Sequence, residues 1–455
     1  MSQWNIYPPQ QEINKSEISI LNIFFIYLIC FIFVVLIRVS TWPDGKHVDS
    51  VFYSQVVLVP LLLGSAISAY YAMFASAIDF YRESKVEISK WRLYHMKKYA
   101  RKHLTIAGWS SITPINNIAL QMLKLEGEYP LSPKTPLRIE TEEDFNVTRL
   151  QKIFTRLIEP LSERLGKYSD IGVTLWVHDA PETAMDDLQI VLQQQKIKFN
   201  DKITCLSECP DYSLLNTMIT ESERYWKYNQ LLIIADLYSD DDIKCMENVS
   251  AFFICKEFPT HEKPRPVYLF QPMADNLELT ESVPVFLAAE QTTVPKTLWY
   301  TGLSKAEKYP LFSALGENKV APDRLELELS FGERTAGYRW LALAIASDAV
   351  MYAQGPQLVA ASEKNKPCLT VLSHALPSVV PEPEVNKFLP PFFYAAIATV
   401  LGIFSAAVAW GVFIGKFNFW WGIFIAFAIV VITMVIGFTL TNSASNQAWE
   451  DIAGS

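Results

Sequence analysis

Cysteine and histidine are the residue types here that suit covalent chemistry. Cys205 or Cys209 with His374 would supply a nucleophile and a base, but neither cysteine has a recognisable catalytic sequence context. The spacing of the two cysteines is one residue longer than that of the common C-x2-C zinc pair, and no histidine stands close by. Buried free thiols are the simpler interpretation of both residues.

Two acidic positions follow apolar runs that are typical of strands. His178-Asp179 follows one such run, where catalytic residues of α/β proteins often lie, and a surface turn is the alternative. Asp240-Asp241-Asp242 offers oxygen ligands for a divalent cation, or forms a solvated loop. Dinucleotide-binding, phosphate-binding, metalloprotease and hydrolase motifs are all missing. The sequence therefore predicts no catalytic residue, no metal and no cofactor.

A third candidate site lies on a predicted helix over 333–351. Arginine, tyrosine and tryptophan dominate protein interfaces, and all three types occur on it at helical spacing. They form a candidate partner-binding patch, with core or plain surface as the alternative: Arg334, Tyr338, Arg339 and Trp340.

These candidates lie between two strongly apolar ends. The chain has 50% apolar and only 19% charged residues, and its net charge of -9 argues against nucleic-acid binding. Four runs are long enough to cross a hydrocarbon core of about 30 Å. They cover residues 18–37, 51–77, 389–414 and 417–440. A cleavable signal peptide fits the first run poorly, because no small-residue cleavage site follows it.

The basic residues predict the orientation of these spans. Eight of them, from Arg82 to Lys102, directly follow the second span, whereas Lys416 is the basic residue between the last two. Because basic residues stay on the cytoplasmic side, the large domain and both termini are expected in the cytoplasm of a bacterial cell, with the spans in its inner membrane. The spans carry no deep charges, so they are expected to be anchors and not a transport path.

Two further surfaces are predicted near the membrane. Small residues at a spacing of four suggest close packing between the two hairpins or between two copies of the chain: Gly64, Ser68, Ala72, Ala407, Gly411 and Gly415. A basic, aromatic helix after the second span suggests contact with anionic lipid headgroups, with an ordinary solvated helix as the alternative: Lys90, Trp91, Arg92, Lys97, Lys98, Arg101 and Lys102.

The middle of the chain alternates short apolar runs with helical patterns, which predicts an α/β domain with a largely parallel sheet. The expected strands include 171–177, 231–235, 252–255, 267–270, 283–288, 298–300, 358–361 and 369–372. The expected organisation is an N-terminal tail (1–17), a first transmembrane hairpin (18–80), a basic helix and linker (81–145), the α/β domain (146–386), a second hairpin (387–441) and a C-terminal tail (442–455).

An internal repeat is predicted within this domain, over 171–290 and 296–376. Leu175-Trp176-Val177 and Leu298-Trp299-Tyr300 begin the two units, and each is followed by a helix, a strand, a long helix and another apolar strand. This layout resembles the doubled halves of the thiolase-like fold, without an active-site motif. Two ordinary βαβ units of similar length are the alternative.

The N-terminal part has a distinctive texture, from Trp4-Asn5-Ile6-Tyr7-Pro8-Pro9 through Arg38-Val39-Ser40-Thr41-Trp42-Pro43-Asp44-Gly45 to Leu123-Lys124-Leu125-Glu126-Gly127-Glu128. It resembles a family of multi-pass proteins encoded beside effectors in bacterial type VI secretion clusters. The resemblance implies an accessory role, as an adaptor that holds a secreted effector or as an immunity protein, and implies no catalytic residues.

Two functions remain in view. The first is a non-catalytic, membrane-anchored protein that binds a secreted effector or a secretion component. The second is an enzyme that acts on lipid or acyl substrates at the inner leaflet. The enzyme hypothesis requires Cys205, Cys209, His178 or His374 to converge in one polar cleft.

Overall fold

The computed structural model describes residues 4, 19–43, 45–142, 146–179, 182–238, 244–256, 258, 264–274, 278–363, 366–384, 390–413 and 419–453. The chain divides into two compact units. One is helical (Ile6–Tyr94 and Pro381–Ser455), and the other is the α/β unit (Met1–Asn5 and His95–Val380).

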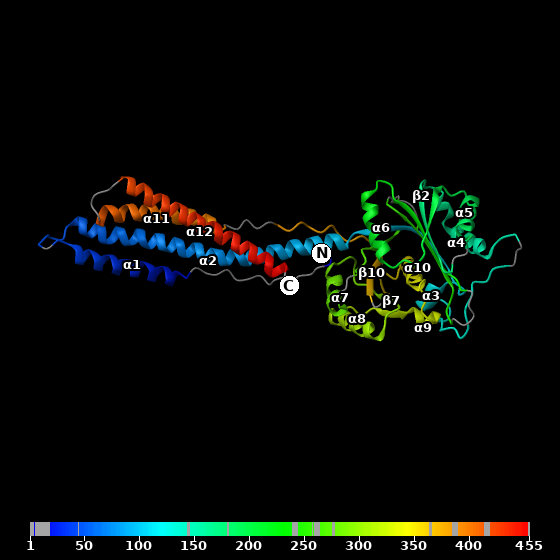
Figure 1. Ribbon diagram of the computed structural model, residues 1–455. Helices are drawn as coiled ribbons and strands as arrows, with labels where there is room; N and C mark the ends of the chain where they lie inside the picture. Colours follow the sequence, from blue (N-terminus) through cyan, green and yellow to red (C-terminus); the bar gives the residue numbers. More distant parts are fainter. Residues whose placement is uncertain are drawn as a thin grey trace. The chain divides into compact units, whose positions relative to one another are not determined.

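The helical unit contains four helices that are long and apolar enough to cross a membrane. They occupy the four stretches that the sequence predicted, and they run side by side (Figure 1). Their bounds are α1 (Ile20–Thr41), α2 (Ser50–Ala100), α11 (Pro391–Phe413) and α12 (Phe419–Ala453).

Close packing between these helices depends on fewer of the small residues than expected. A Cβ atom on Gly64 would lie 2.6 Å from the ring of Tyr27 in α1, so this glycine lets α1 and α2 approach. Gly411 has open space around its Cα, and Ala407 is exposed. Ser68 and Ala72 are half-buried, and Gly415 lies outside the described residues.

Hydroxyl groups join the two hairpins instead. Ser405 Oγ of α11 donates a 2.8 Å hydrogen bond to the carbonyl oxygen of Leu62 in α2. The hydroxyls of Tyr70 in α2 and Thr433 in α12 lie 2.6 Å apart. Each bond satisfies polar groups that have no water partner in lipid, and thereby links α2 to both C-terminal helices.

Helices α2 and α12 also pack together beyond their apolar stretches. Lys85 Nζ lies 2.9 Å from Asp451 Oδ2, and the Arg92 guanidinium donates a 2.8 Å hydrogen bond to the carbonyl oxygen of Ile452. Ile88 and Ala448 add a small buried apolar contact. The stretch expected as a C-terminal tail thus continues α12 as far as Ala453.

The α/β unit is built on one ten-stranded sheet, ordered β3-β2-β4-β5-β1-β6-β10-β9-β7-β8. The first five strands are β1 (His103–Ile112), β2 (Ile171–Val177), β3 (Phe199–Cys205), β4 (Asn229–Asp236) and β5 (Asn248–Cys255). The second five are β6 (Val267–Phe270), β7 (Thr297–Thr301), β8 (Asp323–Glu326), β9 (Gln357–Glu363) and β10 (Lys366–Ser373).

The sheet consists of two halves with the same strand pattern. In the first half, β2 is parallel to β3 and β4, and β5 is antiparallel to β4 and to β1. In the second half, β7 is parallel to β8 and β9, and β10 is antiparallel to β9 and to β6. Antiparallel pairing of β1 with β6 joins them. This confirms a duplicated α/β architecture, but each half begins one strand earlier than predicted, because β1 lies in the stretch assigned to a basic helix and linker.

The helices of this unit form layers around the sheet. Their bounds are α3 (Ile118–Met122), α4 (Arg149–Leu165), α5 (Ala184–Gln194), α6 (Ser213–Arg224), α7 (Leu279–Ala288), α8 (Lys305–Glu317), α9 (Leu327–Phe331) and α10 (Tyr338–Met351). Helices α4 and α5 lie on one side of β2, and α6 lies on the other (Figure 1).

Helix α10 forms the centre of the unit. It contacts β5 and β1 of the first half and β7, β9 and β10 of the second. Of its fourteen residues, all but Asp348 and Met351 are buried. A helix that is apolar on every side belongs in the middle of a core, so the placement follows from its composition.

The structure corrects two predicted strands. The run 283–288 belongs to helix α7, whose buried residues Leu279, Val283 and Phe286 recur at helical spacing. The second strand of the later repeat unit, expected over 325–329, is divided between the end of β8 and the short helix α9. Short apolar runs have the same appearance in buried helices and buried strands, which explains both errors.

Candidate functional site

A cleft of about 690 Å³ opens where the two central helices begin. Its walls come from the segment that leads into α6, from the first turn of α10 and from the hairpin between β9 and β10. The polar side chains along it are Glu208, Cys209, Asp211, Arg339, Ser362 and Lys366.

The location follows from the topology. β3 ends at Cys205 and β9 ends at Glu363, so the carboxyl ends of parallel strands from both halves open toward this cleft. Crevices at the carboxyl ends of parallel strands are the usual ligand sites of α/β folds. The cleft is therefore the principal candidate site of the unit.

The helix starts at the cleft are fixed by hydrogen bonds across the two halves. Tyr212 donates from its phenol oxygen to the carbonyl oxygen of Arg339 at 2.6 Å, and Trp340 Nε1 donates to Pro210 at 2.8 Å. Burial raises the pKa of Tyr212 well above its usual value, so its phenol keeps the proton that it donates. These side chains hold the cleft in shape.

Cys209 lines the cleft, just before α6. Its thiol lies 3.4 Å from the carbonyl oxygen of Ala336, which directly precedes the start of α10. It is half-buried, whereas Cys205 is exposed. A carbonyl oxygen can only accept a hydrogen bond, so the thiol is the donor in this contact.

A second cavity, of about 640 Å³, shares the segment 206–209 with the cleft. Its lining brings together His178, Asp179, Cys205 and Cys209. Three of the four side chains that the enzyme hypothesis requires thus face one cavity. The fourth, His374, lies elsewhere, with its Nδ1 atom 2.8 Å from the carbonyl oxygen of Pro266.

His178 is flanked by two carboxylates. Its Nδ1 lies 3.7 Å from Oδ1 of Asp236, and its Nε2 lies 3.4 Å from Oδ2 of Asp179. Asp236 is fully buried and accepts a 2.7 Å hydrogen bond from the backbone N–H of Gly337 at the start of α10. A Cβ at Gly337 would lie 2.5 Å from that of Asp236, so only glycine fits there.

Sequence reasoning singled out His178 but missed Asp236 and Tyr212. The sequence signal that could have revealed Asp236 was its position at the end of a predicted strand. Asp236 is the last residue of an apolar strand, in the strand next to the one that precedes His178. Asp240-Asp241-Asp242 lies outside the described residues. Among the residues that the structure describes, no group of three His, Cys, Asp or Glu side chains is placed to hold a metal ion.

The structure corrects the predicted partner-binding patch on the helix at 333–351. Tyr338 and Trp340 are buried in the core, and Arg339 is 8% exposed. Arg334 precedes the helix and donates hydrogen bonds to the carbonyl oxygens of Gly302 and Ser362. Their spacing fitted a surface patch, but α10 is enclosed on all sides, and the core interpretation explains Tyr338 and Trp340.

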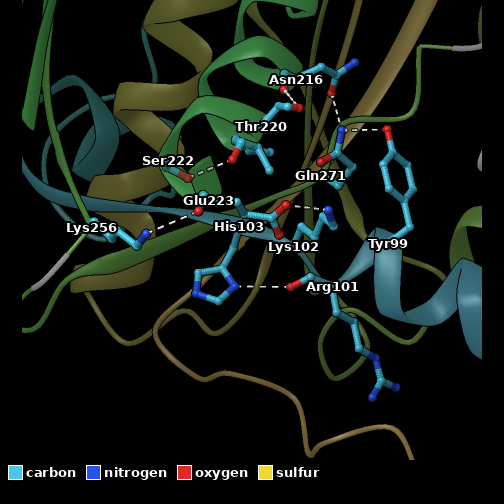
Figure 2. Close-up of polar contacts among 11 residues, drawn as sticks. Tyr99, Arg101, Lys102, His103, Asn216, Thr220, Ser222, Glu223, Lys256 and Gln271 are labelled. Atoms are coloured by element: carbon cyan, nitrogen blue, oxygen red, sulfur yellow. Dashed lines mark hydrogen bonds and ion pairs between the residues drawn. The ribbon is translucent and has the colours of Figure 1, made fainter. Parts of the chain in front are cut away.

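Several candidate lipid-binding residues belong to the α/β unit and form ion pairs within it. Lys97 Nζ and the Arg101 guanidinium lie 2.7 Å and 3.3 Å from Glu290, and Lys102 Nζ lies 2.5 Å from Glu223. Figure 2 shows Lys102 beside Glu223, and Gln271 between Tyr99 and Asn216. The last turn of α2 is therefore fastened to α6.

The other lipid candidates lie earlier on α2. Arg92 bonds to the end of α12, as described above, and the ring of Trp91 packs edge-on against Tyr94 at 5.7 Å. Lys90 is exposed and Lys98 is also exposed. Lipid contact by these residues remains a prediction.

No protein-family model and no curated protein matches this sequence. Solved structures do match. A type II PKS ketosynthase in complex with its acyl-carrier protein is 9% identical, covering 60% of this chain and 99% of its own, with a TM-score of 0.46. The 3-oxoacyl-[acyl-carrier-protein] synthase III from Aquifex aeolicus is 15% identical, with coverages of 59% and 99% and a TM-score of 0.35. OleA from Xanthomonas campestris is 10% identical, with coverages of 60% and 99% and a TM-score of 0.37.

With TM-scores below 0.5, these matches carry no argument about activity. The strand order carries the assignment: each half has three parallel strands followed by an antiparallel one, and the two halves join through their first strands. The α/β unit has a thiolase-like fold, flanked in the sequence by long apolar helices.

Proposed function

We propose that this protein is a non-catalytic, membrane-anchored binding protein whose α/β unit captures a protein partner at the cleft between its halves. The supporting observation is that side chains at the starts of α6 and α10 are already engaged in hydrogen bonds within the protein. Tyr212 and Trp340 bond to backbone carbonyls, and the Cys209 thiol points at one as well. Groups committed in this way maintain the shape of a cleft and leave its rim for recognition.

The rim carries charges of both signs, from Glu208, Asp211 and Lys366. Such a mixed rim suits a protein segment, because complementary charges orient a partner. The resemblance to proteins encoded beside type VI effectors suggests a secreted effector or a secretion component as that partner. The apolar helices would keep the capture site at the inner membrane, with the α/β unit in the cytoplasm.

The test uses the full-length protein purified from native membranes. Co-purified proteins are quantified by mass spectrometry for the native chain, for Lys366→Glu and for Glu208→Lys. A secreted effector that is recovered with the native chain and reduced at least tenfold by both substitutions supports the proposal. Lys198→Glu is the matched control, because Lys198 is exposed just before β3, at the opposite end of that strand from the cleft. Equal recovery with all variants would contradict it.

A second candidate is an enzyme acting on lipid or acyl substrates at the inner leaflet. The observation that favours it is the cavity shared by His178, Cys205 and Cys209. Incubation with an acyl thioester, followed by intact-mass measurement, tests it: an acyl adduct that disappears in Cys209→Ser or Cys205→Ser would replace the binding proposal. Lipid recovered alone in the affinity experiment would point the same way.

A further inference from the structure

A third cavity, of about 410 Å³, lies at the other end of α10 from the cleft. Its walls come from β1, from α4 and from the last turn of α10. Its polar and aromatic side chains are Trp109, Glu163, Arg164, Lys167, Asp348 and Tyr352.

The cavity lies where the seam between the two halves stops. β6 pairs with β1 only along His103–Ile106, and the pairing of β1 with β5 is interrupted by a bulge between Ile106 and Gly108. A Cβ at Gly108 would lie 3.0 Å from Leu161 of α4, so the bulged strand runs close to that helix. The residue inserted by the bulge turns the next side chain, Trp109, toward α10.

Trp109 meets Asp348 there. Its Nε1 donates a 2.8 Å hydrogen bond to Oδ1 of Asp348. Oδ2 has no hydrogen-bond partner among the described residues, and Asp348 lines the cavity. Asp348 also stands in the last turn of α10, where the helix carbonyls add negative potential. The carboxyl group therefore presents one acceptor oxygen to the cavity.

The basic residues of the same cavity are occupied by neighbours. Lys167 lies 3.7 Å from Glu163 in an i,i+4 ion pair. The Arg164 guanidinium lies 5.5 Å from the ring centre of Phe258 and donates to the carbonyl oxygen of Pro264 at 3.5 Å. Asp348 thus has no cationic partner among the described residues.

Aromatic rings complete the site. Trp109 and Tyr352 both line the cavity beside Asp348. Aromatic faces near a carboxylate attract ammonium and guanidinium groups through the ring quadrupole. We propose that this cavity binds a cationic nitrogen group, with Asp348 as its counter-ion and Trp109 and Tyr352 as its aromatic walls.

The chemistry fits a free amine or guanidine as well as a lysine or arginine side chain of a protein. This goes beyond the capture of a partner at the cleft, because the two cavities share no residue. Burial raises the pKa of Asp348 to about 6, so the counter-ion is present at neutral pH and is neutralised in acid.

The test is calorimetric titration of the full-length protein in detergent with methylguanidine, butylamine and a short peptide that carries one arginine. Binding at pH 8 that weakens at least tenfold in Asp348→Asn and decreases below about pH 6 supports the proposal. Much tighter binding of the peptide would identify a protein side chain as the ligand, and equal affinities would identify a free amine.

Two controls separate loss of the site from loss of the fold. Glu163→Gln changes a carboxyl in the same wall that is already paired with Lys167, and binding should be unchanged. Trp109→Phe removes the indole donor and keeps the carboxyl, so binding should persist in a folded protein. No binding by the native protein, binding unaffected by Asp348→Asn, or binding of inorganic phosphate that depends on Arg164 would each overturn the proposal.

Discussion

The phenol of Tyr212 donates a 2.6 Å hydrogen bond to the backbone carbonyl of Arg339, across the boundary between the two halves of the duplicated sheet. Tyr212 precedes α6 in the first half, and Arg339 lies in the first turn of α10 in the second. The bond therefore joins the two helix starts that frame the cleft.

Tyr212→Phe should destabilise the α/β unit by about 1–2 kcal/mol, because a buried hydrogen bond between the two halves is lost and no water replaces it. Chemical denaturation of the purified protein measures the change. Tyr309→Phe is the matched control, since Tyr309 is 77% exposed. Equal midpoints for both variants would show that this bond does not hold the halves together.

Trp4 should be an anchor for the N-terminal end of the chain. Its indole is 3% exposed, stacks on Phe286 with ring centres 5.8 Å apart, and donates to the carbonyl oxygen of Pro272 at 3.3 Å. We expect Trp4→Ala to lower the stability of the α/β unit by about 3 kcal/mol, as for other buried aromatic truncations. Calorimetry should show a lower unfolding temperature for Trp4→Ala. The unfolding temperature of Trp226→Ala should be unchanged, because that side chain is 78% exposed.

His103 should make the α/β unit sensitive to acid. Burial between Tyr268 and Phe270 lowers its pKa below the usual value of about 6.5. The unfolded chain then binds the proton more readily than the folded chain. The free energy of unfolding is therefore highest above about pH 6.5 and decreases as the pH falls below it. The unfolding temperature should decrease less between pH 7.5 and pH 5 in His103→Gln than in the native protein. His47→Gln, in an exposed loop, should leave the pH dependence as it is.

Two glycines of the helical unit should respond differently to the same substitution. Gly64→Ala places a methyl group against the ring of Tyr27 and should cost about 1–3 kcal/mol of stability in detergent. Gly411→Ala adds a methyl group in open space and should be neutral or slightly stabilising. Thermal unfolding monitored by circular dichroism compares the two, and a reversed order would rule out close packing at Gly64.

The proposed orientation can be tested with one native and one introduced cysteine. Cys205 is exposed on the α/β unit, and His47→Cys places a thiol in the exposed loop between α1 and α2. A membrane-impermeant maleimide should label the introduced cysteine in intact spheroplasts, and Cys205 only after the inner membrane is opened. Labelling of Cys205 in intact spheroplasts would place the α/β unit on the outer side.

Much of the fold could be predicted, because length and periodicity carry it. The four apolar helices are long enough to be unambiguous, and the Trp176 and Trp299 anchors reveal the duplication. β1 was missed because it directly follows the last turn of α2, so the basic helix and the strand merge in the sequence. The first half was therefore begun one strand late, and β6, which was predicted as a strand, was counted in the first unit of the repeat although it begins the second half.

The candidate site was less predictable, because it is assembled from distant segments. His178 and Asp236 are neighbours through strand pairing, and Cys209 and Ala336 meet where two helices begin. A single sequence gives no information on these contacts. The arginine, tyrosine and tryptophan of α10 have interface-like composition, yet enclosure by both sheet halves buries Tyr338 and Trp340. Composition alone does not distinguish a core helix from a binding face.

The outermost strands of the sheet, β3 and β8, also bear on how the protein behaves when many copies crowd one membrane. An unpaired strand edge can template the addition of a strand from a neighbouring copy. β8 is only four residues long and exposes Asp323 and Arg324, and β3 exposes Lys202. Short length and charge oppose such templating, which protects densely packed copies from aggregating edge to edge.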